Sequence, residues 1–314
     1  MKNCSHCNLY YKTNLENFCA KCGNQLEEFD PFKRKTIRYS LFWILGGALL
    51  LVIIATVLEI SNKTSEPFFS VIGIGYILYF IITLWILWTI KSRNINFKLL
   101  TGKITSMNSN IFIFFGFITM TAIILGTTSI ESFILNKIPI ISEIIAELKN
   151  EPIIFTKEET SLPFLTNTLM FIQIVLIAPI IEELSFRGIL LSRFSTKWNL
   201  TTGIILSSIL FGILHMNPLG ACLGGIVLAI TYIKTQTLIA PILLHIIYNA
   251  FIYSLTFFQE GLMKSTISLE ETVSIETALF SLAFTLPIFG FFMWKYWPQK
   301  NDVLPYKANS NNTV

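Results

Sequence analysis

The chain has 314 residues, of which 53% are hydrophobic and 13% are charged, and its mean hydropathy is +0.63. Soluble domains carry about 25% charged residues, so this composition excludes an ordinary soluble fold. The net charge of +4 is spread over the polar connections between apolar segments, so we expect no nucleic-acid partner.

The first apolar segment is preceded by a polar region that holds four of the five cysteines. Cys4-x2-Cys7 and Cys19-x2-Cys22 are separated by 11 residues, a spacing at which two turns can present four thiolates to zinc. Two disulfides are the alternative, but the cytoplasm is reducing, so a structural zinc ribbon at residues 1–30 is favoured. This region also lacks the apolar core of a cleavable signal peptide. A four-cysteine site has no open coordination position, so we expect a role in folding or partner docking.

The rest of the chain predicts an all-α, polytopic membrane helix bundle of about eight transmembrane helices. Apolar stretches of about 20 residues can each cross a hydrocarbon core of about 30 Å. The predicted spans are residues 39–58, 67–90, 111–130, 163–187, 200–216, 218–233, 237–258 and 277–294. Residues 132–160 mix apolar and acidic side chains and are expected to form an external loop or interfacial helix. The polar tail after residue 297 is expected to have no stable structure.

The charges of the connections predict the orientation. Cytoplasmic loops carry an excess of Lys and Arg, and with eight crossings the basic connections all fall on the side of the two termini. These basic residues are Lys33, Arg34, Lys35, Arg38, Lys91, Arg93, Lys98, Lys103, Arg193, Lys197, Lys234, Lys295 and Lys300. The opposite loops are acidic. We therefore predict a multi-pass protein of the cell membrane with both termini in the cytoplasm.

Ionisable groups are rare inside these apolar spans, and each one is a candidate functional residue because burying it in a membrane is unfavourable. The fourth span contains Glu182, Glu183 and Arg187. Glu183 and Arg187 are four residues apart and can pair on one helix face. Glu182 lies about 100° further around the helix and can point toward a cavity. Two carboxylates therefore have different predicted tasks, Glu183 in holding the helix and Glu182 in chemistry.

Two of the three histidines also lie within apolar helices. His215 follows Phe211 by one helical turn, and His245 precedes Asn249 by one turn, which places imidazole and carboxamide on one face. A single intramembrane histidine is more often a hydrogen bond between helices than a catalyst. Several such groups at similar depth in neighbouring spans favour one shared site.

These residues resemble a known family. Glu182-Glu183-x3-Arg187, Phe211-x3-His215 and His245-x3-Asn249, in that order on successive helices, resemble the three motifs of the CAAX protease and bacteriocin-processing family of intramembrane proteases. That family includes the type II CAAX prenyl endopeptidases and bacterial Abi-type proteins. The resemblance covers roughly residues 163–258, whereas the cysteine-bearing ribbon and the first three spans lie outside it.

The resemblance implies an endopeptidase that hydrolyses a peptide bond of a membrane-associated or lipid-modified substrate. Glu182 would activate water with the help of His215, while His245 and Asn249 would donate hydrogen bonds to the scissile carbonyl. A glutamate and two histidines could instead hold a catalytic metal, although the His-Glu-x-x-His motif is absent. We take the metal-free mechanism as the working hypothesis and keep the metal as its alternative.

Two other functions fit the same residues. A bacteriocin-immunity or scaffold protein could keep the motifs for packing, and a proton-coupled transporter could use Glu and His as a relay. Complete motifs argue against the first, and the lack of paired inverted repeats argues against the second. The predicted organisation is a zinc ribbon at 1–30, membrane helices and an external loop at 31–162, a protease core at 163–258, and a last helix and polar tail at 259–314.

Overall fold

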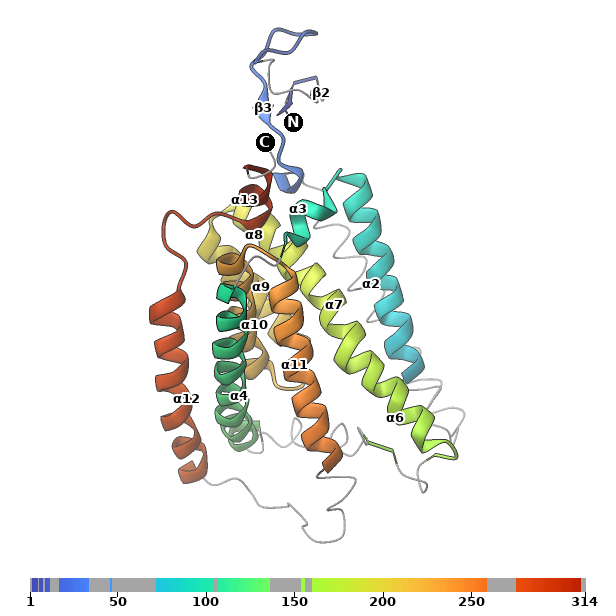
Figure 1. Ribbon diagram of the computed structural model, residues 1–314, viewed down its shortest axis with the longest axis vertical. Coiled ribbons are helices and arrows are strands. Elements are labelled where there is room, and N and C mark those ends of the chain that lie inside the picture. Colours follow the sequence, from blue (N-terminus) through green and yellow to red (C-terminus); the bar gives the residue numbers. More distant parts are fainter. Residues whose placement is uncertain are drawn as a thin grey trace.

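The computed structural model describes residues 2–4, 6–7, 9–11, 17–33, 46, 72–103, 107–135, 154–155, 160–258 and 275–311. The first predicted span, 39–58, lies outside the described residues apart from residue 46. Most of the predicted external loop at 132–160 lies outside them as well. The polypeptide otherwise forms a bundle of helices with a small strand-containing unit at the end where both termini lie (Figure 1).

The helices of the bundle begin and end close to the predicted spans. The long helices are α2 (Gly73–Ser92), α4 (Met107–Leu135), α10 (Pro218–Thr235), α11 (Ile239–Thr256) and α12 (Ile275–Tyr296). Shorter ones are α3 (Phe97–Thr101), α9 (Leu200–Ile213) and α13 (Pro305–Asn311). The N-terminal unit holds strands β1 (Lys2–Asn3), β2 (Tyr10–Tyr11) and β3 (Glu27–Glu28), in the order β2-β1-β3, followed by the turn η1 (Pro31–Lys33).

One further helix is continuous from Pro163 to Lys197 and contains two π-helical segments. It consists of α6 (Pro163–Phe171), the π-helical segment η3 (Ile172–Ile177), α7 (Ala178–Glu183), a second π-helical segment η4 (Leu184–Leu191) and α8 (Ser192–Lys197). At 35 residues it is longer than the predicted span 163–187, because its last turns extend into the polar end of the bundle. Wide π turns inside α-helices often occur at functional sites.

The fold class is confirmed as a mostly helical, multi-pass membrane bundle. Six helices in the described part of the chain are long and apolar enough to cross a membrane. The predicted span at 200–216 corresponds to α9, whose 14 residues measure about 21 Å and are short for a complete crossing. Seven of the eight predicted spans thus coincide with helices, and the remaining one is 39–58, of which the structure describes residue 46 alone.

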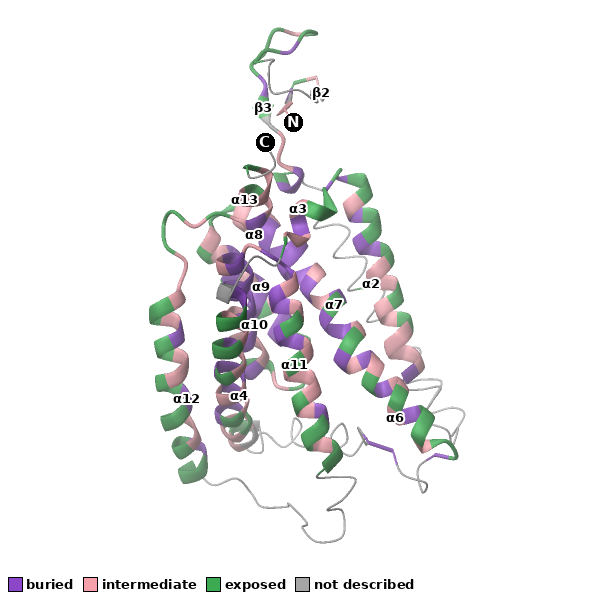
Figure 2. Cartoon of the chain, in the orientation of Figure 1, coloured by how far each residue is buried: buried purple, intermediate pink, exposed green. Residues whose placement is uncertain are grey.

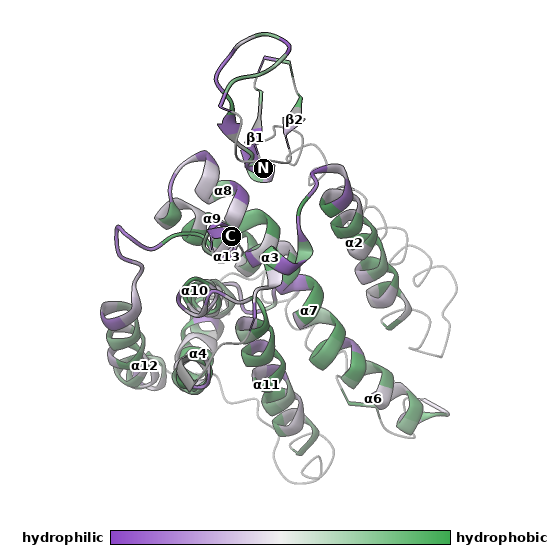
Figure 3. Ribbon diagram, turned by 45° about the horizontal axis from the view of Figure 1, so that its top comes forward, coloured by the Kyte–Doolittle hydropathy of each residue, from purple (hydrophilic) through white to green (hydrophobic). Residues whose placement is uncertain are grey.

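The centre of the bundle is α10, which is the most deeply enclosed of these six spans (Figure 2). Its buried face packs with α4, α11 and α12 around Ile123, Leu228, Leu244 and Phe292. Helices α2 and α12 lie at the outside and expose large apolar side chains such as Phe80 and Phe284, as expected where lipid replaces water (Figure 3).

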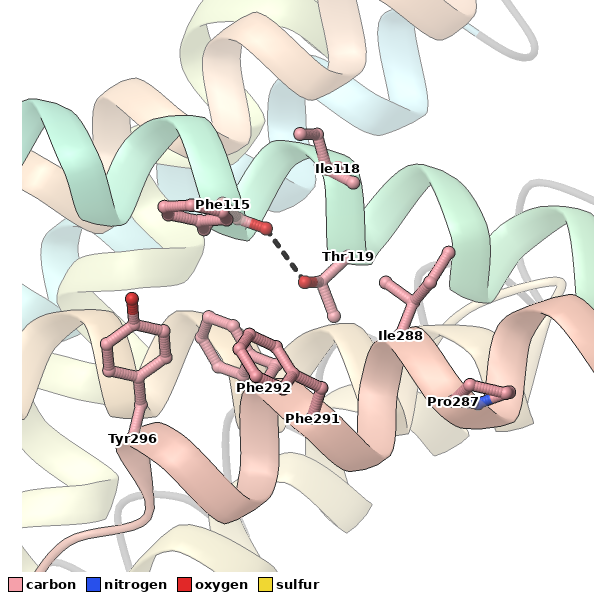
Figure 4. Close-up of a pocket in the computed structure, with 8 residues that line it drawn as sticks. All are labelled: Phe115, Ile118, Thr119, Pro287, Ile288, Phe291, Phe292 and Tyr296. Atoms are coloured by element: carbon pink, nitrogen blue, oxygen red, sulfur yellow. Dashed lines mark hydrogen bonds between the residues drawn. The ribbon is translucent and has the colours of Figure 1, made fainter.

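Helices α4 and α12 also enclose an apolar groove of about 320 Å³ (Figure 4). Its lining is formed by Phe115, Ile118, Thr119, Pro287, Ile288, Phe291, Phe292 and Tyr296. The hydroxyl of Thr119 donates to the carbonyl of Phe115 within its own helix, and the other lining hydroxyl belongs to Tyr296. The groove therefore presents little polar chemistry, and no predicted site residue lines it.

The expectation that the tail after residue 297 has no stable structure was wrong. Residues 305–311 form α13, which packs on α3. The Asn309 carboxamide donates to the carbonyls of Leu99 and Gln236 at 3.0 and 3.1 Å. The rings of Tyr306 and Phe32 meet edge to face with their centroids 5.3 Å apart. Polar composition hid this docking because its hydrogen bonds go to helix-end carbonyls that no local pattern marks.

The two-sided distribution of charge yields a topology prediction. A reporter enzyme that is active in the cytoplasm should be active when fused after residue 314, since that end lies beside the basic connections. The same reporter inserted within residues 259–274 should be inactive. A fusion at 314 that reads external would contradict the predicted orientation of the termini.

Candidate active site

The two glutamates lie on α7, between the two π-helical segments, and Pro179 explains the first of these. In η3 the amide of Ala178 donates to the carbonyl of Gln173, five residues back. The carbonyl of Ile174 would next receive the amide of residue 179, but a proline has no N–H. The change of winding therefore leaves the Ile174 carbonyl without a helical partner.

Asn249 supplies the missing partner from α11. Its Nδ2 donates to the Ile174 carbonyl oxygen at 2.9 Å. Because an unsatisfied carbonyl inside a membrane is costly, this contact stabilises the wide turn and ties α11 to the glutamate-bearing helix. One Asn249 N–H is thus committed to the fold, and the second N–H of the carboxamide is the one that could meet a substrate.

Glu183 is completely buried and joins three elements. Its Oε1 lies 2.8 Å from Nη1 of Arg187 on the next turn and 3.0 Å from Nδ1 of His245 on α11. Arg187 also donates through Nη2 to the Gly225 carbonyl of α10 at 3.1 Å. The guanidinium carbon is 4.4 Å from the centroid of the Phe211 ring on α9. The predicted pair of Glu183 and Arg187 is present, and it forms the centre of a larger network.

The contacts of the two histidines fix the positions of their protons. Nδ1 of His245 meets the Glu183 carboxylate, and Nδ1 of His215 lies 2.6 Å from the Phe211 carbonyl oxygen. Carboxylates and carbonyls only accept hydrogen bonds, so each Nδ1 carries the proton. In the neutral imidazoles each Nε2 therefore presents a lone pair.

Glu182 faces both of these nitrogens. Its Oε2 lies 3.8 Å from Nε2 of His215 and 3.9 Å from Nε2 of His245. These separations exceed a direct hydrogen bond. Both separations suit a bridging water molecule, which donates one proton to Oε2 and the other to an imidazole Nε2. His215 is one-third exposed, whereas the His245 side chain is 5% exposed, so the His215 side is the more accessible one.

The other oxygen of Glu182 is held by a residue that the sequence did not reveal. The Tyr79 hydroxyl on α2 donates to Oε1 of Glu182 at 2.9 Å. Tyrosine is a common residue of membrane helices, and no spacing relative to the motifs singles this one out. The structure links five of the predicted site residues through their side chains, Glu182, Glu183, Arg187, His215 and His245. Asn249 lies one turn beyond His245 on α11 and contacts the Ile174 backbone, and Tyr79 is added to the set.

The comparisons with known proteins support the resemblance that the motifs predict. Residues 164–251 match the family model of Rce1-like type II CAAX prenyl endopeptidases. The match covers the segment that carries the three motifs, so the chain is similar to this family there. A stretch of 87 residues is 32% identical to the putative membrane peptidase YdiL of Bacillus subtilis. This stretch covers 27% of the present chain and 36% of that protein. No solved structure matches the chain.

Helix α2, with Tyr79, precedes the matched segment, and so does the N-terminal cysteine cluster. The sulfurs of Cys4, Cys7, Cys19 and Cys22 all lie within 4.8 Å of one another, an arrangement that can bind a metal ion. Four sulfurs around one zinc are roughly 3.8 Å apart, which this cluster fits. Gly23, at a φ of 72°, allows the turn after the second pair. The boundaries of the four predicted domains stay a prediction.

The electrostatics of the cysteine cluster favour a cation. A hydrogen bond from the Tyr11 hydroxyl lowers the pKa of Cys19 to about 6. The hydrogen bond between Cys7 and Cys22 raises the pKa of the Cys7 thiol to about 12. Crowded sulfurs thus resist carrying several negative charges at once, and a bound metal ion removes this repulsion while it deprotonates the thiols.

The role of Asn249 as a cap can be tested with a double-mutant cycle. Asn249→Ala should lower stability by about 1–3 kcal/mol, because it strands the Ile174 carbonyl. In a Pro179→Ala background the new N–H can satisfy that carbonyl, so the same change should be clearly less destabilising. Thermal unfolding of the four purified proteins in one detergent measures the coupling. Equal losses in both backgrounds would show that Asn249 does not act as the cap.

Proposed function

We propose that this chain is an intramembrane endopeptidase that hydrolyses a peptide bond of a membrane-associated or lipid-modified substrate with water activated by Glu182. The Rce1-like match and the membrane-peptidase relative support an intramembrane protease at the level of the family. The single observation that carries the proposal is the convergence of Glu182 Oε2 with Nε2 of His215 and of His245.

The first step follows from this geometry. Water that bridges these atoms donates one hydrogen to Oε2 of Glu182 and another to an imidazole Nε2. Glu182 accepts the proton as the water oxygen attacks the carbonyl carbon.

The second requirement is stabilisation of the oxyanion. Nδ1 of His245 is committed to Glu183, so His245 can donate from Nε2 only after the proton released by the attacking water has passed to it from Oε2 of Glu182, 3.9 Å away. The second N–H of Asn249 is the other available donor. Arg187 neutralises Glu183 and keeps it in place instead of acting on the substrate.

A metal-dependent version of the same reaction has one observation in its favour. Three acceptor atoms also suit a cation, and each Nδ1 makes the kind of contact that supports a metal-bound histidine. Among the described residues, however, the cysteine sulfurs are the ligand set whose members all lie within 4.8 Å of one another. Glu182 and the two histidines would have to move closer to hold one ion. We therefore assign the metal to the ribbon, as structural zinc.

The catalytic proposal predicts non-additive losses. Glu182→Ala, His215→Ala and His245→Ala act on one transition state, so each should remove most of the activity and each double variant should cost little more. Cleavage of a membrane-anchored reporter peptide in proteoliposomes, per amount of folded protein, is the measurement. Glu276→Gln is the matched control, because Glu276 lies in the first turn of α12, a helix that carries none of the site residues. A wild-type cleavage rate from folded Glu182→Ala protein would rule out the proposed protease mechanism. Solute flux driven by a pH gradient would instead favour a transporter.

The ribbon predicts its own metal content. Purified protein should contain about one zinc per chain, and the double substitution Cys19→Ser, Cys22→Ser should remove it, since thiolates supply the ligands. Cys222→Ser on α10 is the control and should leave zinc unchanged. Elemental analysis and cleavage rates are measured together. Zinc that persists in the double variant would place the ion at the histidines and reverse the choice between the two mechanisms.

A further inference from the structure

Helix α2 lies alongside the helix that carries the glutamates, although it precedes the segment that matches the protease family (Figure 1). We propose that Tyr79 of α2 is a positioning residue that orients Glu182 by holding Oε1, and that α2 is therefore part of the active site. This inference rests on the proposed function. It adds a residue that the motifs do not contain.

Two tyrosine hydroxyls connect α2 to the long helix. Tyr76 donates to the Leu169 carbonyl oxygen and Tyr79, one turn later, to Oε1 of Glu182, both at 2.9 Å. The first contact joins α2 to a backbone atom, whereas the second joins it to the proposed base. Tyr76 can therefore serve as the control for Tyr79, because its hydrogen bond joins the same two helices without involving the proposed base.

The approach of the two helices is close enough to define the position of Tyr79. Gly75 lies one turn before Tyr79, and a Cβ atom built on it would come within 1.8 Å of Nε2 of Gln173. A larger residue at position 75 would have to displace the Gln173 carboxamide, which lies directly against this turn of α2. Beyond Tyr79, the helices continue to pack through Trp85, Ile86 and Ile181. The hydroxyl is therefore held by packing on both sides along the helix.

The hydrogen bond assigns different tasks to the two oxygens of Glu182. Tyr79 occupies Oε1, and Oε2 is the oxygen that faces His215 and His245. In the described part of the chain, Tyr79 is the group that donates a hydrogen bond to this carboxylate. Without it, the carboxylate can rotate about its last torsion and lose its alignment with the water. Productive catalytic geometry tolerates deviations of only about 0.5 Å.

Removal of the hydroxyl alone tests the proposal. Tyr79→Phe keeps the ring in its packed position, and we expect kcat to fall roughly 10- to 100-fold, as for a lost hydrogen bond to a charged group, with KM nearly unchanged. Tyr76→Phe removes an equally short hydrogen bond from the same helix and should stay within about twofold of the wild type. p-Aminophenylalanine at position 79 keeps a donor near the same place and should restore much of the rate.

A second measurement does not depend on proteolysis. A hydrophobic carbodiimide reacts with protonated carboxyl groups, and its attachment to Glu182 can be quantified by mass spectrometry, with Glu182→Gln as the blank. The Tyr79 hydroxyl occupies Oε1 of Glu182 through its hydrogen bond, so Tyr79→Phe leaves this oxygen free for the reagent and should label faster than both the wild type and Tyr76→Phe.

The two measurements separate the failure of this inference from that of the proposed function. If the wild type cleaves the reporter but Tyr79→Phe matches it in kcat and in labelling, Tyr79 does not position Glu182. Equal losses of kcat in Tyr76→Phe and Tyr79→Phe would likewise overturn the inference, because helix docking would explain both. If the wild type does not cleave while the labelling difference is present, the protease proposal fails and the contact with Glu182 stands.

Discussion

The buried carboxylate of Glu183 joins the helices that form the candidate site. One oxygen meets both Arg187 and His245, and Arg187 extends the network to the Gly225 carbonyl of α10. Removing one partner of such a buried pair leaves an uncompensated charge and lowers the stability of the fold by about 3–5 kcal/mol. Each member therefore helps to hold the others in place. The orientation of the His245 ring follows from this contact, and with it the direction in which Nε2 points.

The winding of the glutamate-bearing helix is a second constraint, and it links local sequence to the site. Pro179 removes one backbone donor just after a π turn, and Asn249 of α11 compensates at the Ile174 carbonyl. A residue expected from the motif to act on substrate thus also maintains the shape of the helix that presents Glu182 and Glu183. Two tasks on one side chain explain how a motif of few residues can specify both the fold and the chemistry of a membrane site.

Helix α2 lies outside the segment that matches the family model, but it contacts a glutamate of the candidate site. The contacts of Tyr76 and Tyr79 run along the same face, and Gly75 allows the close approach that both require. At the other end of the bundle, α13 and the turn at Phe32 cover the loops between the helices, and Arg193 of α8 donates to the Phe32 carbonyl. The segments outside the family match are therefore integral to the structure of the core.

The sequence by itself determined the helical membrane class, most of the spans, the cysteine cluster and the six polar residues of the site. These are local properties of the sequence. The length of an apolar run can be compared directly with the thickness of the bilayer, and an ionisable group within such a run can be recognised whichever way its side chain points. Only the tertiary structure decided that Tyr79 meets Glu182, that Glu183 is shared by Arg187 and His245, and that the polar tail docks as α13. Hydrogen-bond partners between helices depend on which faces meet and how the chain winds, and neither is encoded in the spacing of a single segment.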